Sequence, residues 1–358
     1  MNYKMTTSLS DKLKVISFIC IVMVVWIHSY YTEGEKYLST RFLMSFIGEG
    51  MCLVAVPMFY LISGYLFFLK TIDTGIKTIF LKQKKRIRSL LVPYVLANLL
   101  SVLFYFLLKL ITVVDPNIQG LINTNLLDRA QGGFFHSIYY CFWDGPIAFQ
   151  LWFVRDLMLF VLFAPIIYYV LLFVTRNLLL TIIGVIISLI IIIYHHDSFI
   201  WSLSWFFLGG ILSMSDKLNV IAFGRKYWYG LICIIIAIAS FLINALNDIG
   251  YCAPWVNKDI SILFGIQGLW ILYDKCKLIH SSSKIWNNVL GSTFFIYLIH
   301  EPSLNVFKKI PLFIGESALV FNLSYLLCPV IFIVAAVFFC HFIKNHYPKA
   351  YKIYTGGR

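Results

Sequence analysis

The sequence predicts an all-α protein, a polytopic membrane helix bundle of about ten transmembrane helices with both termini in the cytoplasm. Hydrophobic residues make up 60% of the chain and charged residues only 13%, and the mean hydropathy is +0.84. Because a soluble domain usually has about 25% charged residues, water cannot be the solvent for so much apolar surface. The apolar residues also fall into runs long enough to cross a bilayer, and the loops between these runs differ in charge.

Ten segments approach the roughly 20 apolar residues that one crossing needs. They are residues 14–31, 46–69, 89–112, 148–174, 177–194, 199–214, 228–246, 259–273, 288–307 and 318–343. No linker, low-complexity tract or internal repeat interrupts them, so we expect residues 1–358 to form one integral-membrane domain. The one long loop covers about 113–147. The apolar run from Val15 to Ile27 lacks a following cleavage site of small residues, so we interpret it as an uncleaved first helix.

The charge of the loops indicates the topology. With the N-terminus inside, the cytoplasmic segments contain most of the 29 lysines and arginines, whereas only Asp11, Asp73, Asp216 and Asp274 of the 16 acidic residues lie on that side. Basic residues hold loops in the cytoplasm. This bias explains the formal net charge of +13 better than nucleic-acid binding does. We therefore expect a multi-pass protein of the inner or plasma membrane.

The eight cysteines do not indicate a metal site. None forms a CxxC pair, and most lie in apolar runs, where cysteine behaves as a small hydrophobic residue. We therefore predict no metal centre and no permanently bound cofactor.

Ionisable residues within membrane spans are costly, so each is a candidate functional residue. The first is His28, which lies ~21 Å along the first helix from Lys14. At ~100° per residue, Lys14 and Ser17 lie within about 40° of the face that carries His28. A polar stripe therefore connects a cytoplasmic cation to a histidine in the outer half of the membrane. The alternative is an inert histidine that is hydrogen-bonded at the outer interface.

Arg155 and Asp156 lie near the outer start of the fourth span, ~10 Å below the surface. Successive side chains on a helix diverge by about 100°, so we expect these two not to pair with each other. One is expected to face the polar centre of the bundle, and the other a loop or a helix end. The alternative is a structural ion pair with another helix.

The ninth span carries Tyr297, His300 and Glu301. His300 is expected at a depth similar to that of His28, and Tyr297 lies one turn below it on the same face. Pro302 leaves a backbone carbonyl one turn earlier without its donor and favours a kink. A kink beside a histidine and a glutamate suits a pocket, although it also suits an ordinary helix end.

A basic cluster at residues 82–88 precedes the third span on the cytoplasmic side. Lys85 and Arg88 lie one turn apart, with Arg86 between them. Such a cluster binds phosphates or anionic lipid heads, or it only anchors the topology. In the first case, a phosphate-bearing donor approaches from inside the cell and an acceptor approaches from outside.

Six short segments follow one another along the chain in a characteristic order. They are Val24–Ser29, Val56–Tyr65, Lys85–Arg88 with Pro93 and Tyr94, Leu151–Phe153 with Pro165, Trp205–Gly209, and Tyr297–Glu301. In this order, and combined with ten spans, they resemble the integral-membrane acyltransferase family (acyltransferase 3 type), whose members O-acylate bacterial surface glycans. The resemblance covers nearly the whole chain.

The resemblance implies transfer of an acyl group, typically acetyl, from cytoplasmic acyl-CoA to a hydroxyl of a lipid-linked or surface carbohydrate. His28 matches the first-helix histidine of the family, which implies a general base. The family commonly has an arginine eleven residues earlier, where this chain has Ser17, and we expect Lys14 to substitute. Lys85 likewise stands where the family has an arginine. The phosphates of acyl-CoA are then expected on Lys14, Lys85, Arg86 and Arg88.

The other candidates receive roles in the same chemistry. A histidine with a pKa near 6.5 can accept and return a proton at neutral pH. Arg155 or Tyr297 is expected to stabilise the developing oxyanion, and Glu301 or Asp156 to orient an imidazole. Direct transfer and transfer through an acyl intermediate both stay open.

Two other functions are compatible with the sequence. An exporter of a polysaccharide or a lipid-linked intermediate, without acyl-transfer activity, would also bury histidine, arginine and aspartate. Carriers often contain internal repeats, and this sequence shows none. A structural partner in a glycan-synthesis complex is the other alternative.

Overall fold

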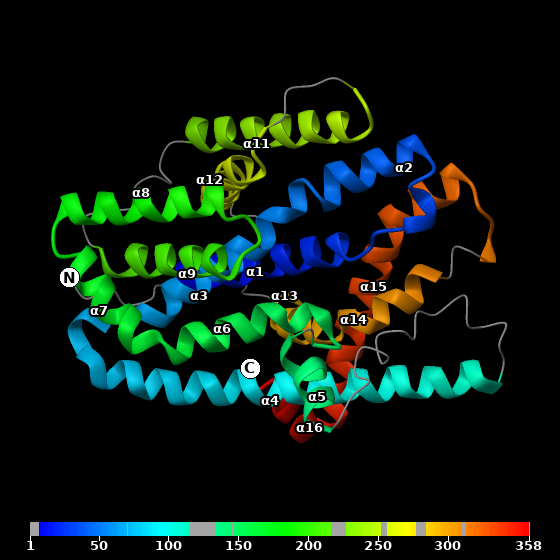
Figure 1. Cartoon of the computed structure of the whole chain (residues 1–358), viewed down its shortest axis with the longest axis horizontal. Helices are drawn as coiled ribbons and strands as arrows, with labels where there is room; N and C mark the ends of the chain where they lie inside the picture. The colour runs from blue at the N-terminus through cyan, green and yellow to red at the C-terminus, as the bar shows by residue number, and fades with distance from the viewer. Residues whose placement is uncertain are drawn as a thin grey trace.

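The computed structural model is helical in every regular element of the residues that it describes, which are 7–69, 71–114, 134–144, 146–215, 227–251, 256–276, 284–309 and 313–357. The first helix contacts α3, α12, α13, α14 and α15, so it lies inside the bundle (Figure 1). The α-helices are α1 (Thr7–Ile27), α2 (Leu38–Leu43), α3 (Ala55–Phe68), α4 (Thr71–Val114), α5 (Phe134–Tyr139), α6 (Trp152–Leu162), α7 (Ala164–Val174), α8 (Leu178–Tyr194), α9 (Phe199–Met214), α11 (Tyr227–Asp248), α12 (Lys258–Cys276), α13 (Lys284–Gly291), α14 (Thr293–Lys309), α15 (Ala318–His346) and α16 (Pro348–Tyr354).

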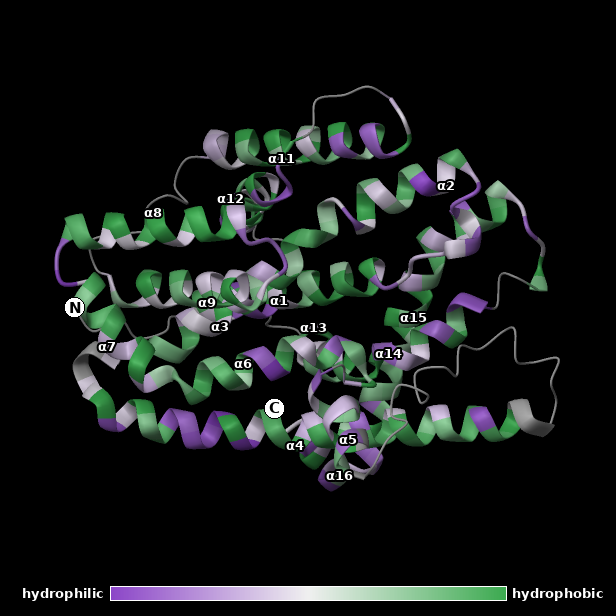
Figure 2. Cartoon of the chain, viewed as in Figure 1, coloured by the Kyte–Doolittle hydropathy of each residue, from purple (hydrophilic) through white to green (hydrophobic). Residues whose placement is uncertain are grey.

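Several of these helices suit a bilayer. Within the described residues, Leu38–Phe68, Thr74–Ile111, Tyr227–Asp248 and Ala318–His346 are long and apolar enough to cross it, and the bent pair α6–α7 makes a possible fifth span. Apolar residues cover much of α8, α11 and α15 (Figure 2). The chain is therefore a multi-pass membrane protein. The count of ten spans and the cytoplasmic location of both termini stay predictions.

Helices α3 and α9 pack with their backbones in contact. The Cα atom of Gly64 faces the carbonyl oxygen of Phe206, and Gly209 faces the carbonyl oxygen of Leu61. A Cβ atom at either glycine would collide with these oxygens, so only glycine permits the approach. Small residues are the usual means by which helices associate closely in membranes. The packing places the start of α9 beside the central helices, where the candidate site lies.

The predicted span 148–174 is not one continuous helix. It bends by 69° between α6 and α7. Pro165 has no N–H to donate to the carbonyl oxygen of Val161. The side chain of Gln83 takes that place, because its Nε2 atom donates to Val161 O at 3.1 Å and to Leu162 O at 2.7 Å. The break is thus a consequence of proline, stabilised by a residue of the basic cluster.

Two other expectations about boundaries need correction. The predicted loop 113–147 contains α5 and a π-helical turn at Tyr140–Asp144, and residues 115–133 lie outside the described part. The basic cluster, expected to precede the third span, lies within α4 (Thr71–Val114), which is broken at Gly75 (φ 69°, ψ −172°) and is helical from there through the cluster into the apolar run. Lysine and arginine are good helix formers, so a charged segment extends the helix beyond the apolar run.

The kink predicted beside Pro302 is confirmed. Within α14, Glu301 has φ −109° and ψ 134°, which is outside the helical region. A residue that precedes proline is pushed towards extended geometry because the proline ring clashes with its backbone. The break turns the second half of α14 towards the end of α1.

Candidate active site

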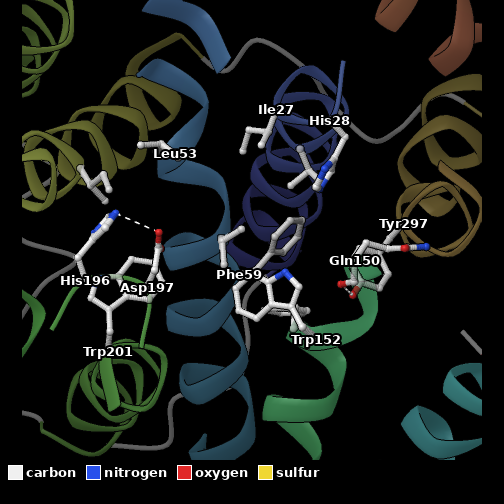
Figure 3. Close-up of a pocket in the computed structure, with 14 residues that line it drawn as sticks. Ile27, His28, Leu53, Phe59, Gln150, Trp152, His196, Asp197, Trp201 and Tyr297 are labelled. Atoms are coloured by element: carbon white, nitrogen blue, oxygen red, sulfur yellow. Dashed lines mark hydrogen bonds and ion pairs between the residues drawn. The ribbon is translucent and has the colours of Figure 1, made fainter. Parts of the chain in front are cut away.

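A cavity of about 210 Å³ lies between α1, α3, α6, α12, α14 and the hairpin that joins α8 to α9 (Figure 3). Its wall is mostly apolar and aromatic, with a few polar groups, as is typical of ligand sites. The lining residues are Val24, Ile27, His28, Leu53, Val56, Phe59, Gln150, Trp152, Phe153, His196, Asp197, Trp201, Ile262 and Tyr297.

His28 lies at one end of this cavity, directly after the last residue of α1. Its backbone N–H continues the helical pattern by donating to the carbonyl oxygen of Val24 at 3.1 Å. The ring lies edge-on to Phe149, with centroids 4.8 Å apart. The carbonyl oxygen of His28 accepts a hydrogen bond of 2.9 Å from Lys308 Nζ. This lysine satisfies a carbonyl at the C-terminal end of α1, where a cation is also favoured by the helix dipole.

His300 is fully buried beside His28, and the two ring centroids lie 5.1 Å apart. Nδ1 of His300 lies 2.9 Å from the carbonyl oxygen of Tyr297. Because a carbonyl can only accept, Nδ1 carries the proton and Nε2 carries a lone pair. That Nε2 atom has no hydrogen-bond partner among the described residues. A buried imidazole lone pair without a partner is suited to accept a proton from a bound molecule.

Gln150 connects the start of α6 to α14. Its carbonyl oxygen accepts from the hydroxyl of Tyr297 at 2.6 Å, and its Nε2 atom donates to the carbonyl oxygen of Glu301 at 3.1 Å. The side-chain oxygen of Gln150 has no partner among the described residues. The carboxylate of Glu301 accepts from Asn305, one turn further along the chain. Gln150 therefore holds the kinked part of α14 against the cavity.

Arg155 and Asp156 correct a prediction. They do pair with each other, because Nε and one terminal nitrogen of Arg155 lie 3.1 and 3.0 Å from Oδ1 of Asp156. The long arginine side chain curls back and overcomes the divergence of the two Cα–Cβ bonds. The other terminal nitrogen donates to the carbonyl oxygen of Trp143 at 2.8 Å. The pair thus attaches the π-helical turn that follows α5 to the helix α6. Neither residue lines the cavity.

The opposite end of the cavity holds a second histidine, which the sequence reasoning missed. His196 Nδ1 lies 2.9 Å from both carboxylate oxygens of the buried Asp259, and Trp201 Nε1 donates to Asp259 at 2.8 Å. His196 Nε2 lies 3.3 Å from Asp197. Hydrogen bonds to Asp197 and Asp259 raise the pKa of His196 to about 9, so this imidazole is cationic at neutral pH.

The predicted donor-binding residues lie away from the cavity lining. Lys14, Lys85 and Arg88 are exposed, and Lys14 forms an ion pair of 3.8 Å with Asp11. Arg86 is half-buried; its carbonyl oxygen accepts from the hydroxyl of Ser89, whereas its guanidinium forms no hydrogen bond or ion pair with another described residue. An arginine in such a position is available for an anion.

Lys12, which the sequence reasoning passed over, is the buried lysine of α1. Its Nζ atom lies 2.7 Å from Asp274 and 3.8 Å from the ring centroid of Trp270. This arrangement ties the start of α1 to the end of α12. On the described part of the chain, Lys12 is thus committed to structure, whereas Lys14 is open to solvent.

The structure therefore assembles part of the predicted set. His28 and Tyr297 line one cavity and His300 adjoins it, whereas Arg155, Asp156 and Glu301 do not line it. Gln150, Lys308, and the His196–Asp197 hairpin were not predicted. The one signal for the hairpin was the polar run between two strongly apolar segments, residues 195–198.

The comparison with protein families gives one match. A family model described as "Acyltransferase domain" matches residues 11–344, which is most of the chain and includes His28, His300 and the basic cluster. No curated protein and no solved structure matches the chain. Because the family model covers far more than half of the sequence, the chain belongs to the acyltransferase 3 family, and it is a membrane-bound acyltransferase.

Proposed function

We propose that this acyltransferase moves an acyl group, typically acetyl, from cytoplasmic acyl-CoA to a hydroxyl of a lipid-linked or cell-surface carbohydrate. One observation carries the proposal: the imidazoles of His28, which lines an aromatic cavity, and of His300, beside it, are neighbours, and the buried Nε2 of His300 has no hydrogen-bond partner among the described residues. Membership in an acyltransferase family favours this function over export without chemistry.

In the proposed reaction, an imidazole acts as the general base. The acceptor O–H gives its proton to the ring nitrogen of His28 or to Nε2 of His300, and the oxygen attacks the thioester carbonyl carbon. The new C–O bond forms as the C–S bond breaks, and the proton passes from the imidazolium to the departing thiolate. The same groups serve a route through an acyl-enzyme intermediate. The hydroxyl of Tyr297 already donates a hydrogen bond to the carbonyl oxygen of Gln150. To stabilise the oxyanion, Tyr297 must therefore give up this hydrogen bond and donate to the oxyanion instead.

The donor is proposed to bind through its phosphates at the basic face of α4, which is formed by the basic cluster at residues 82–88. Arg86 is the strongest candidate there, because it is half-buried and makes no ion pair with a described residue. Lys14, Lys85 and Arg88 are exposed and supply further positive charge. We propose that this face is cytoplasmic and that both termini lie on the same side of the inner or plasma membrane, since basic loops are retained there.

The decisive experiment uses His28→Ala in cells whose surface glycans are analysed by mass spectrometry. We expect acylation to be lost, because the proposed base is absent, while the variant still inserts in the membrane in normal amounts. His341→Ala is a matched control, since His341 is an exposed histidine near the end of α15. Full acylation of glycans by a normally inserted His28→Ala protein contradicts the assignment.

A further inference from the structure

The end of the cavity opposite His28 has no part in the proton transfer described above. His196 and Asp197 line this end, and they come from the short hairpin between α8 and α9 (Figure 3). We propose that it is the acceptor subsite, in which Asp197 accepts hydrogen bonds from sugar hydroxyls and so selects the hydroxyl that reaches His28. This inference rests on the proposed function, because it takes the acceptor to be a carbohydrate.

The buried half of this cluster is already satisfied. Asp259 is only 2% exposed, and its carboxylate accepts from both His196 Nδ1 and Trp201 Nε1. These bonds hold the imidazole of His196 in one orientation. Both carboxylate oxygens of Asp259 have a partner, so this arrangement is a rigid support for His196 and for Asp197, which His196 contacts.

The open half of the cluster is Asp197. Its side chain is 74% exposed, and only one carboxylate oxygen, at 3.3 Å from His196 Nε2, contacts a described residue. The positive charge of Lys258 also acts on Asp197, so His196 and Lys258 hold the carboxylate ionised. An ionised carboxylate with free lone pairs forms short, charge-assisted hydrogen bonds with hydroxyl groups. The residue has φ 55°, which aspartate tolerates better than most residues do.

The space between the two polar ends has the character of a sugar site. Phe59 and Trp152 lie between His28 at one end and Asp197 at the other (Figure 3). Aromatic faces accept the C–H face of a sugar ring, and polar groups at the rim bind its hydroxyls.

The test uses the purified full-length protein in lipid nanodiscs with acetyl-CoA and a panel of methyl glycosides of hexoses and N-acetylhexosamines. Products are identified by mass spectrometry. We expect Asp197→Ala to lower kcat/KM for the glycoside about 10–100-fold, because a charge-assisted hydrogen bond is lost. The KM for acetyl-CoA and the slow hydrolysis of acetyl-CoA should not change. His195→Gln is the matched control, since His195 is an exposed neighbour in the same hairpin and does not line the cavity.

Asp197→Asn protects the test against misfolding, because asparagine also tolerates a positive φ and keeps one acceptor oxygen. We expect it to lie between the wild type and Asp197→Ala. Unchanged glycoside kinetics in both Asp197 variants would overturn the subsite. A raised KM for acetyl-CoA with unchanged glycoside kinetics would also overturn it, by assigning this end to the donor. Failure of the wild type to acylate any glycoside, combined with unmodified glycans in cells, would instead refute the proposed function and this inference with it.

Discussion

The imidazole rings of His28 and His300 lie 5.1 Å apart, although one follows the first helix and the other belongs to α14. The relationship depends on the kink at Glu301 and on Lys308, which bonds to the backbone of His28 from the second half of the same kinked helix. The two histidines therefore form one unit, and a change in either should affect the same chemical step.

Replacing His300 should impair catalysis as strongly as replacing His28. Because Nε2 of His300 is buried and has no partner in the described part of the chain, His300→Ala removes a candidate base, and we expect kcat to fall about 10²–10⁴-fold. Acetyl transfer to carbohydrate by the purified variant measures this. The KM for acetyl-CoA should stay near the wild-type value, since His300 is not one of the basic residues proposed to bind the donor phosphates. Near-normal kcat in a folded His300→Ala protein would show that the ring only packs against His28.

Lys308 is predicted to position His28. Lys308→Met removes the 2.9 Å hydrogen bond to the carbonyl oxygen of His28, and we expect kcat to fall about 10-fold through a displaced ring. Lys308→Arg should restore part of the activity, because it keeps a cationic donor. Lys309→Met is the control, since the neighbouring Lys309 binds Glu33 instead. Equal losses in the two Met variants would argue against a specific effect on His28.

His196 should make the stability of the protein depend on pH. Hydrogen bonds to Asp197 and Asp259 raise its pKa to about 9, above the ordinary value near 6.5. The folded state thus binds the proton more tightly than the unfolded state does. The resulting stabilisation is fully present below pH ~6.5 and is lost as the pH rises through about 9.

The measurement is the difference in Tm between wild type and His196→Gln in detergent from pH 6 to pH 10. We expect the wild type to be the more stable protein at pH 6 and the difference to shrink towards pH 10. A difference that is constant over this range would mean that His196 contributes through packing and not through its charge.

The contact between α3 and α9 should not tolerate a methyl group. Gly64→Ala places a Cβ atom against the carbonyl oxygen of Phe206, and we expect a loss of about 1–3 kcal/mol as the helices separate. Thermal unfolding of the solubilised protein measures the loss. Gly291→Ala is the matched control, because nothing lies within 4 Å of the added Cβ there. A similar Tm for both variants would show that the helix pair adjusts without cost.

Much of the fold follows from local patterns. Runs of apolar residues predict the helices α8, α11 and α15, because a segment that must satisfy its backbone in lipid has few alternatives to a helix. Pro302 predicts the kink at Glu301 for a similarly local reason. The bend between α6 and α7 was not predicted, although Pro165 was visible, because whether proline breaks a span depends on a donor such as Gln83 from another helix.

The sequence by itself determined the membrane class and the helical state of most segments, and it singled out His28 and His300 as candidate functional residues because they are ionisable residues within spans. These conclusions depend on the cost of placing polar groups in hydrocarbon, which each segment carries alone. Only the tertiary structure decided that Arg155 pairs with Asp156, that Lys308 bonds to the backbone of His28, and that Asp197 and His28 line the same cavity. Such relationships depend on the distances between residues far apart in the chain, and helix packing, not helical periodicity, sets those distances.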